Sequence, residues 1–291
     1  MSSAEPRETF VEHEGLRLAV LDWGGDGNEP LLLLHPTGFC AGFFHPLASR
    51  LTDRFHTIGI DLPAHGASDA PRDRSGFGFD RYAMHVLAVL DQLGIDRCAV
   101  LGESLGGGVG SLVDEQRPGF IRRLVLCEGI AFDADRIPEI RRVEDPETDN
   151  YMARIARKRK HVWPDRVTVR ESYGSRPPLD VLAPEALDAY VRWGFVDRPD
   201  GQVELACSPD NEATQFEVAM ADTGAPEAGR HLRALSCPAT ILCGDSSNLP
   251  MAWFAAQADA VGTPLVTVEG THFFLQEDTD RAEALVREHL A

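Results

Sequence analysis

Short apolar runs alternate with longer amphipathic stretches along most of the 291-residue chain, and this alternation limits the fold more than any other feature. Runs with the length and apolar content of buried strands lie at residues 31–34, 57–60, 99–101, 123–127, 239–243 and 265–268. Between them, residues 80–93, 105–117 and 278–290 carry apolar side chains at helical spacing. Residues 8–13 and 16–23 flank a Glu14-Gly15 turn and predict an antiparallel edge hairpin. The sequence therefore predicts an α/β fold with a mostly parallel eight-stranded sheet and helices on both faces.

One interval, residues 131–228, breaks this alternation. It has no buried-strand run, and prolines divide its helix-like pieces, so we expect a helical cap inserted into a core of residues 1–130 and 229–291. Five of the eight Trp and Tyr residues fall inside it, although it spans only about a third of the chain. These aromatic side chains either line an apolar pocket or fill the small core of the cap itself.

The composition excludes several classes of function. A formal net charge of -18 repels phosphate backbones and anionic lipids, so neither nucleic acid nor membrane is an expected partner. The one basic cluster, residues 157–160, is expected to be a solvated helix face. The first residues lack the apolar run of a secretory signal, and no stretch approaches a membrane span. Six scattered cysteines indicate reduced packing residues, which predicts a cytoplasmic location.

The strongest chemical motif is Gly102-Glu103-Ser104-Leu105-Gly106, which lies between a predicted strand and a predicted helix. A G-x-S-x-G turn in this context holds its serine in a strained conformation, and the flanking glycines remove side chains that would clash there. The helix that begins beside Ser104 also directs its amide dipoles toward negative charge on a substrate oxygen. The motif predicts Ser104 as a nucleophile rather than a helix cap.

Two further segments complete a resemblance to the α/β-hydrolase superfamily. Residues 31–34 lead into His35-Pro36-Thr37-Gly38, and residues 60–69 are similar to the family's D-x-x-G-H-G-x-S signature, with Ala64 in place of the first glycine. The resemblance implies an oxyanion hole made by the N–H groups of Thr37 and Leu105. Pro36 stands where the family usually has glycine. It has no N–H to donate, but the expected donor is the next residue, Thr37. We assign no chemistry to the second segment, which in the family is a packing and turn motif.

A serine hydroxyl needs a base that later protonates the leaving group, and histidine serves this purpose at neutral pH. His272 follows the last predicted strand and precedes the final helix. This position agrees with the family order of serine, acid and histidine. We therefore expect His272 to be the base.

The acid has two candidates, Glu128 and Asp245, each at the carboxyl end of a predicted strand. Most family members carry the acid in a G-x-x-D pattern after the seventh strand, where this chain has Ser247, and Asp245 stands two positions early. Glu128 ends the sixth strand, the place where haloalkane dehalogenases and some relatives carry their acid. We favour Glu128 and keep Asp245 as the alternative.

These residues predict a serine hydrolase that cleaves a small or medium, partly apolar ester or lactone through an acyl-enzyme on Ser104. We expect no cofactor and no metal, since the chain itself supplies nucleophile, base and charge stabilisation. Dehalogenase and epoxide-hydrolase chemistry is disfavoured because those enzymes use aspartate as nucleophile. The alternatives are a carbon-carbon bond hydrolase on the same scaffold and a noncatalytic ligand receptor that kept the fold. The sequence does not indicate an oligomeric state.

Overall fold

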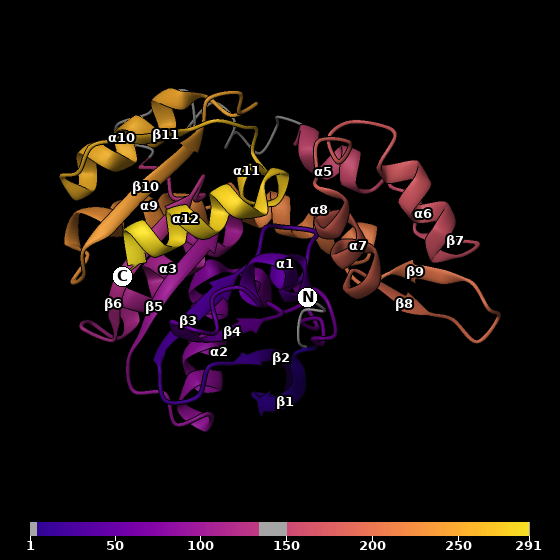
Figure 1. Cartoon of the computed structure of the whole chain (residues 1–291), viewed down its shortest axis with the longest axis horizontal. Helices are drawn as coiled ribbons and strands as arrows, with labels where there is room; N and C mark the ends of the chain where they lie inside the picture. Colours follow the sequence, from indigo (N-terminus) through magenta and orange to yellow (C-terminus); the bar gives the residue numbers. More distant parts are fainter. Residues whose placement is uncertain (1–4, 134–149, 291) are drawn as a thin grey trace.

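An eight-stranded sheet forms the centre of the computed structural model, which describes residues 5–133 and 150–290 (Figure 1). Its strand order is β1-β2-β4-β3-β5-β6-β10-β11. The strands are β1 (Arg7–His13), β2 (Leu16–Gly24), β3 (Glu29–Leu34), β4 (Phe55–Ile60), β5 (Cys98–Glu103), β6 (Ile121–Cys127), β10 (Ala239–Gly244) and β11 (Val266–Val268). The β1-β2 and β2-β4 pairs are antiparallel, and the other pairs are parallel. The predicted edge hairpin and mostly parallel sheet are confirmed.

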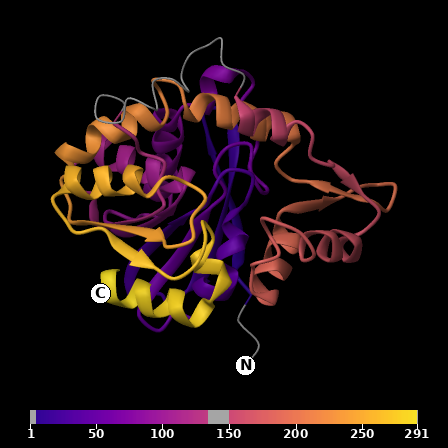
Figure 2. The same ribbon diagram turned by 90° about the horizontal axis from the view of Figure 1, so that it is seen from above.

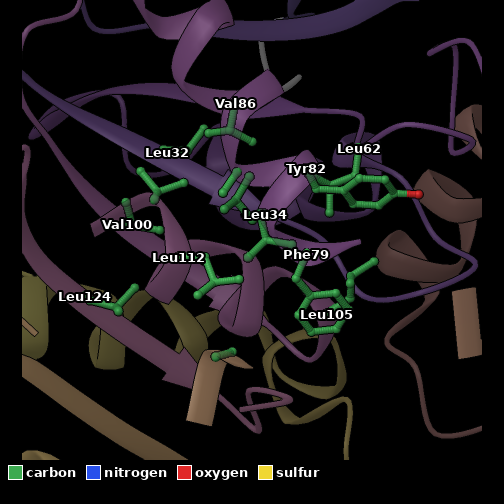
Figure 3. Close-up of a cluster of buried hydrophobic side chains, with 14 of the residues drawn as sticks. Leu32, Leu34, Leu62, Phe79, Tyr82, Val86, Val100, Leu105, Leu112 and Leu124 are labelled. Atoms are coloured by element: carbon green, nitrogen blue, oxygen red, sulfur yellow. The ribbon is translucent and has the colours of Figure 1, made fainter. Parts of the chain in front are cut away.

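Alternation along the strands divides the apolar side chains between the two faces of the sheet. In β3, Leu32 and Leu34 join one buried cluster, and Leu31 and Leu33 join another. Figure 3 shows part of the first cluster, where Leu32 and Leu34 lie among side chains of α2 (Phe79–Gln92) and α3 (Leu105–Gln116). The same cluster takes in α9 (Ala225–His231) and α10 (Met251–Val261). The opposite cluster includes side chains of α1 (His45–Ala48), α11 (Phe274–Glu277) and α12 (Thr279–Leu290).

A second group of elements stands beside the sheet (Figures 1 and 2). We call residues 150–208 the outer segment. It contains α5 (Tyr151–Ala156), β7 (Val162–Trp163), α6 (Arg166–Tyr173), α7 (Pro184–Trp193), β8 (Phe195–Asp197) and β9 (Val203–Leu205), and α8 (Pro209–Ala219) follows it. The expectation of helices alone is incomplete here, because β7, β9 and β8 form an antiparallel sheet. Strands of two or three residues are too short to show an apolar run.

The return to the main core comes before the boundary at residue 229 that the sequence suggested. Val218 and Ala219, at the end of α8, are buried in the cluster around α2 and α3. Ala225 and Ala228 of α9 join them there. The proline-rich interval therefore ends with residues that pack on the sheet.

The remaining short helices are η1 (Ala41–Phe44), η2 (Arg74–Phe77) and η3 (Leu232–Ala234). Across residues 5–133 and 150–290, none of the helices has the length and apolar character that crossing a bilayer demands. All six cysteines are free, and all but the half-buried Cys237 are buried, as packing residues would be.

Candidate active site

Four loops that follow parallel strands bring the expected site residues to one edge of the sheet. Thr37 follows β3, Ser104 follows β5, Glu128 follows β6 and His272 lies beyond β11. Because these strands are parallel, their carboxyl ends lie at the same edge, where ligands of open α/β sheets bind. The expected site is thus assembled by the topology of the sheet.

Ser104 occupies a sharp turn between β5 and α3. Its backbone has φ 53° and ψ -116°, a strained conformation for a residue with a side chain. The turn is held because Ser104 N donates to Cys127 O at 3.0 Å and Ser104 O accepts from Ile130 N at 2.8 Å. A Cβ atom at Gly106 would lie 2.0 Å from the carbonyl oxygen of Leu34, so this approach of α3 to β3 requires glycine.

Glu128 is the second strained residue at this edge, with φ 47°. Its carboxylate is fully buried yet accepts three strong hydrogen bonds. Oε1 accepts from Gly244 N at 2.9 Å, and Oε2 accepts from Ser247 Oγ at 2.7 Å and from His272 Nδ1 at 2.6 Å. The buried carboxylate is therefore satisfied by donors from two loops.

The electrostatic balance at Glu128 favours the ionised form. Burial by itself raises its pKa, but the hydrogen bond and positive charge of His272, the Ser247 hydroxyl and the Gly244 amide together lower the pKa below its usual value. An ionised carboxylate accepts, so Nδ1 of His272 carries the proton of that bond. Nε2 is then the ring nitrogen that can take up a proton.

The carboxylate of Asp245, the alternative acid, bonds to loop backbone and to a neighbouring serine instead of to His272. Its exposed carboxylate accepts from Gly270 N at 3.1 Å and from Ser246 Oγ at 3.0 Å, which ties the loop after β10 to the loop before His272. Nor does Asp245 cap the next helix, since α10 begins only at Met251. In the structure Glu128, and not Asp245, contacts the imidazole.

Sequence reasoning missed the contribution of Ser247. Its hydroxyl donates to Glu128 Oε2 and also accepts from Leu249 N at 3.1 Å. A signal was present, because Ser247 occupies the place where most of the family carries its acid. In this chain the Ser247 side chain shares Glu128 Oε2 with His272 Nδ1, so a side chain at this position lies close to the imidazole.

The two expected oxyanion donors belong to neighbouring turns. Leu105 is the first residue of α3, and Thr37 precedes Gly38, which has φ 80°. Within residues 5–133 and 150–290, neither the Thr37 nor the Leu105 N–H has a protein acceptor. Thr37 is half-buried and Leu105 is buried, so each of these residues carries an amide that the described part of the chain leaves without an acceptor.

The His35 and Asp61 side chains hydrogen-bond to backbone groups of the loops after β3 and β4. His35 Nε2 accepts from Leu62 N at 2.9 Å. Asp61 accepts from Ala41 N at 2.7 Å and from Ala67 N at 2.8 Å. Both side chains are buried and engaged with backbone, as packing and turn residues would be.

A buried ionic cluster joins the outer segment to the Thr37 turn. Arg159 donates to Glu212 Oε2 at 2.5 Å, to Tyr173 Oη at 3.0 Å and to Tyr190 Oη at 2.9 Å. Tyr190 Oη in turn donates to Gly38 O at 3.0 Å. The expectation of a solvated helix face at residues 157–160 is wrong for Arg159, which lies beyond the end of α5 with only 20% of its side chain exposed.

The aromatic residues of the outer segment form a packed cluster with the site loops. The rings of Tyr190 and Phe39 are 4.5 Å apart, and Phe39 and Phe273 are 5.3 Å apart. Trp163 and Tyr173 belong to the same cluster, while Tyr151 is exposed. Of the two alternatives that the sequence left open, packing in a small core describes Trp163, Tyr173 and Tyr190, and this core continues to Phe273, the residue after His272.

One group among the described residues has spacing suited to a metal ion, formed by Asp22, Asp26 and His56. It lies on β2, the following loop and β4, and Asp22 is already paired with Arg7. None of its members belongs to the four site loops.

Comparison with known proteins identifies the family. Residues 29–192 match the alpha/beta hydrolase fold, which is more than half of the chain, so the protein belongs to the α/β-hydrolase family. This membership supports the expected enzyme class, a hydrolase. A serine hydrolase-like protein from Danio rerio is 26% identical over 191 residues, which cover 63% of this chain and 58% of that protein. The match thus spans less than two thirds of that relative.

Solved structures show the same fold over nearly the whole chain. The structure of an E-2-(acetamidomethylene)succinate hydrolase has a TM-score of 0.80 at 21% identity, and covers 98% of this chain and 99% of its own. A thioesterase domain from the curacin biosynthetic pathway has a TM-score of 0.76 at 20% identity and covers 99% of this chain and 100% of its own. At these identities the likeness establishes architecture, and function has to be argued from the site.

Proposed function

We propose that the protein is a serine hydrolase that cleaves small or medium, partly apolar esters or lactones through an acyl-enzyme on Ser104. The observation that carries the proposal is the 2.6 Å hydrogen bond between the buried Glu128 carboxylate and His272 Nδ1, at the edge where Ser104 is held in its strained turn. Serine, histidine and carboxylate on three separate loops are the groups that acyl transfer requires.

The first half-reaction forms the acyl-enzyme. Ser104 Oγ attacks the substrate carbonyl carbon while His272 Nε2 takes the hydroxyl proton. The carbonyl π electrons move to oxygen, and this oxyanion accepts hydrogen bonds from the N–H groups of Thr37 and Leu105. When the carbonyl re-forms and the bond to the leaving oxygen breaks, His272 returns the proton to that oxygen; the resulting alcohol departs from an ester, or stays attached to the acyl group of an opened lactone.

The second half-reaction restores the enzyme. His272 takes a proton from water, the resulting hydroxide oxygen bonds to the acyl carbon, and the bond to Ser104 Oγ breaks with the proton returned to the serine. The product is a carboxylic acid. Glu128 remains ionised throughout, orients the imidazole and stabilises its positive form. Since these side chains supply nucleophile, base and charge stabilisation, the cycle needs no metal and no organic cofactor.

The substrate class is inferred from the surroundings of the site. We assign the outer segment to the cap, because its aromatic cluster includes Phe39 and Phe273 of the site loops. An apolar substrate portion suits such surroundings. Two of the structural neighbours are named for hydrolysis of acyl compounds, an acetamide and thioesters, which agrees with attack at a carbonyl carbon. The six free cysteines suit a cytoplasmic enzyme.

A fluorophosphonate probe tests the proposal, because it forms a stable bond only with an activated serine. We expect labelling of the full-length protein at Ser104, identified by peptide mass, and none in Ser104→Ala. Ser246→Ala is a matched control in a nearby loop and should label normally. A folded wild-type protein that binds small esters without labelling would instead be a noncatalytic receptor. Labelling without ester turnover would direct attention to carbon-carbon bond substrates.

A further inference from the structure

The buried carboxyl group of Glu103 is not used by the reaction proposed above. Glu103 is the last residue of β5, directly before Ser104, and only 1% of it is exposed. Its Oε2 accepts from Gln276 Nε2 at 2.7 Å. Gln276 lies on α11, four residues after His272, so this contact joins the nucleophile turn to the helix that follows the base.

Two acceptors at this contact are left without donors. Glu103 Oε1 and Gln276 Oε1 are both buried, and neither has a hydrogen-bond partner among the described residues. Buried acceptors without donors are rare in folded proteins and costly, so a pair of them at one contact indicates a missing hydrogen-bond donor.

The charges around Glu103 oppose its ionisation. Cys127 and Glu128 of the neighbouring strand β6 and its loop face it, and Gln276 faces it from α11. Glu128 is held ionised by His272. No Lys, Arg or His contributes to the pKa of Glu103 in the described chain, and an unpaired second carboxylate beside Glu128 would be strongly disfavoured.

We propose that Glu103 is a neutral carboxylic acid whose Oε1–H donates to Gln276 Oε1, and that this reciprocal acid-amide pair positions the nucleophile turn against the helix after His272. One proton supplies the donor that both orphaned oxygens lack. The protonation of Glu103 is independent of the reaction, whereas its role as a positioning residue rests on the proposed function.

The pair gives the enzyme an alkaline limit. Burial first, and then the negative charge of Glu128, raise the pKa of Glu103 to about 8, although the Gln276 hydrogen bond lowers it. As the pH rises through this value, the pair loses its donated proton and gains a charge beside Glu128. We expect turnover to fall above about pH 8 and to level off about tenfold to a hundredfold lower, where the pair is broken.

Infrared difference spectroscopy of the full-length protein tests the protonation state without reference to activity. Below the pKa, wild type should show a carboxylic acid carbonyl band that is absent from Glu103→Gln and disappears as the pH is raised. If wild type and Glu103→Gln show the same acid bands at every pH, Glu103 is ionised and the proposal fails.

Turnover of a generic ester tests the positioning role. Glu103→Gln can form a reciprocal amide-amide pair but cannot ionise, so it should keep activity within about threefold at neutral pH and lose the alkaline decline. Glu103→Leu and Gln276→Leu break the pair and should each lower kcat about tenfold to a hundredfold, with KM little changed.

The outcomes separate this proposal from the previous one. An alkaline decline that persists unchanged in Glu103→Gln would overturn the positioning role, while fluorophosphonate labelling of Ser104 would still support the serine hydrolase. Absence of labelling at every pH would overturn the proposed function, and the infrared result would still decide the protonation of Glu103. Thermal unfolding of each variant checks that it is folded.

Discussion

Glu128 reaches the imidazole from the end of β6 because its backbone accepts a positive φ and its side chain spans the gap to the His272 loop. Strain of this kind persists where surrounding contacts hold it, and here Gly244 and Ser247 do so through the two carboxylate oxygens. Glu128, the proposed acid, and the groups that hold it thus follow neighbouring strands.

Substitution of the two candidate acids ranks them. Glu128→Gln removes the charge that orients and stabilises the imidazolium, so kcat on a generic ester should fall about a thousandfold or more. Asp245→Asn keeps a side chain that can accept from Gly270 N and should lower kcat less than about tenfold. Steady-state kinetics at neutral pH measures both. The opposite ranking would make Asp245 the acid.

At this scale the residue types were predictable but their contacts were not. Ser104 and His272 stand in positions where local sequence determines the turn. The choice between Glu128 and Asp245 depends on the path of the loop after β10, which no local pattern specifies. Ser247 was visible only as a departure from the family pattern, and its role requires the coordinates of Glu128.

The turn between β5 and α3 depends on the close approach of a helix to a strand. A Cβ at Gly106 would lie 2.0 Å from Leu34 O. Leu34 is the last residue of β3 and leads into the Thr37 turn, so a side chain at position 106 must displace both α3 and this part of the backbone. Gly110, on the same helix, would place its Cβ 3.2 Å from Leu124 Cδ1 and 3.3 Å from Val100 Cγ1, which are side-chain methyl groups rather than backbone. A larger residue at position 106 therefore meets backbone, whereas one at position 110 meets side chains.

We expect Gly106→Ala to lower the free energy of unfolding by about 1–3 kcal/mol and to slow fluorophosphonate labelling of Ser104. Gly110→Ala should change stability by less than about 1 kcal/mol, because the better helix propensity of alanine offsets the tighter contact. Chemical denaturation and labelling rate check both variants. Equal losses in the two would mean that the approach of α3 to Leu34 is not specially demanding.

Elements were predicted well where they are long or fully buried. The sheet strands follow from apolar runs, and α2, α3 and α12 from helical spacing. The strands β7, β8 and β9 escaped because two or three residues carry no period. Their sheet forms only through pairing across the outer segment, which is a tertiary effect.

At the scale of the whole molecule, the contacts of Arg159 with Glu212, Tyr173 and Tyr190 connect the outer segment to α8. The Glu212 side chain is only 8% exposed, so its charge depends on Arg159 for compensation. Removing one partner of a buried ion pair leaves the other charge unpaired, whereas removing both is far less costly. Residues so far apart in sequence give no local signal, which is why Arg159 was counted with its exposed neighbours Arg157, Lys158 and Lys160 as part of a solvated face.

A double-mutant cycle measures this link. Arg159→Met and Glu212→Gln should each destabilise the protein by about 3–5 kcal/mol, and the double variant by clearly less than the sum. Urea denaturation of the four proteins gives the coupling energy. Arg170→Met, which removes an exposed ion pair with Asp188, is the control and should cost less than about 1 kcal/mol. Additive losses would show that Arg159 and Glu212 act separately.

The link between Arg159 and Glu212 also decides where this protein can be recombined with its relatives. A chimera that exchanges only residues 150–208 carries away Arg159, Tyr173 and Tyr190 and leaves Glu212 behind in α8. It would strand a buried carboxylate 2.8 Å from the Cβ position of Gly38, at the entrance to the Thr37 turn. A workable crossover point therefore lies beyond Glu212, and an exchanged outer segment has to bring the helix that carries this residue with it.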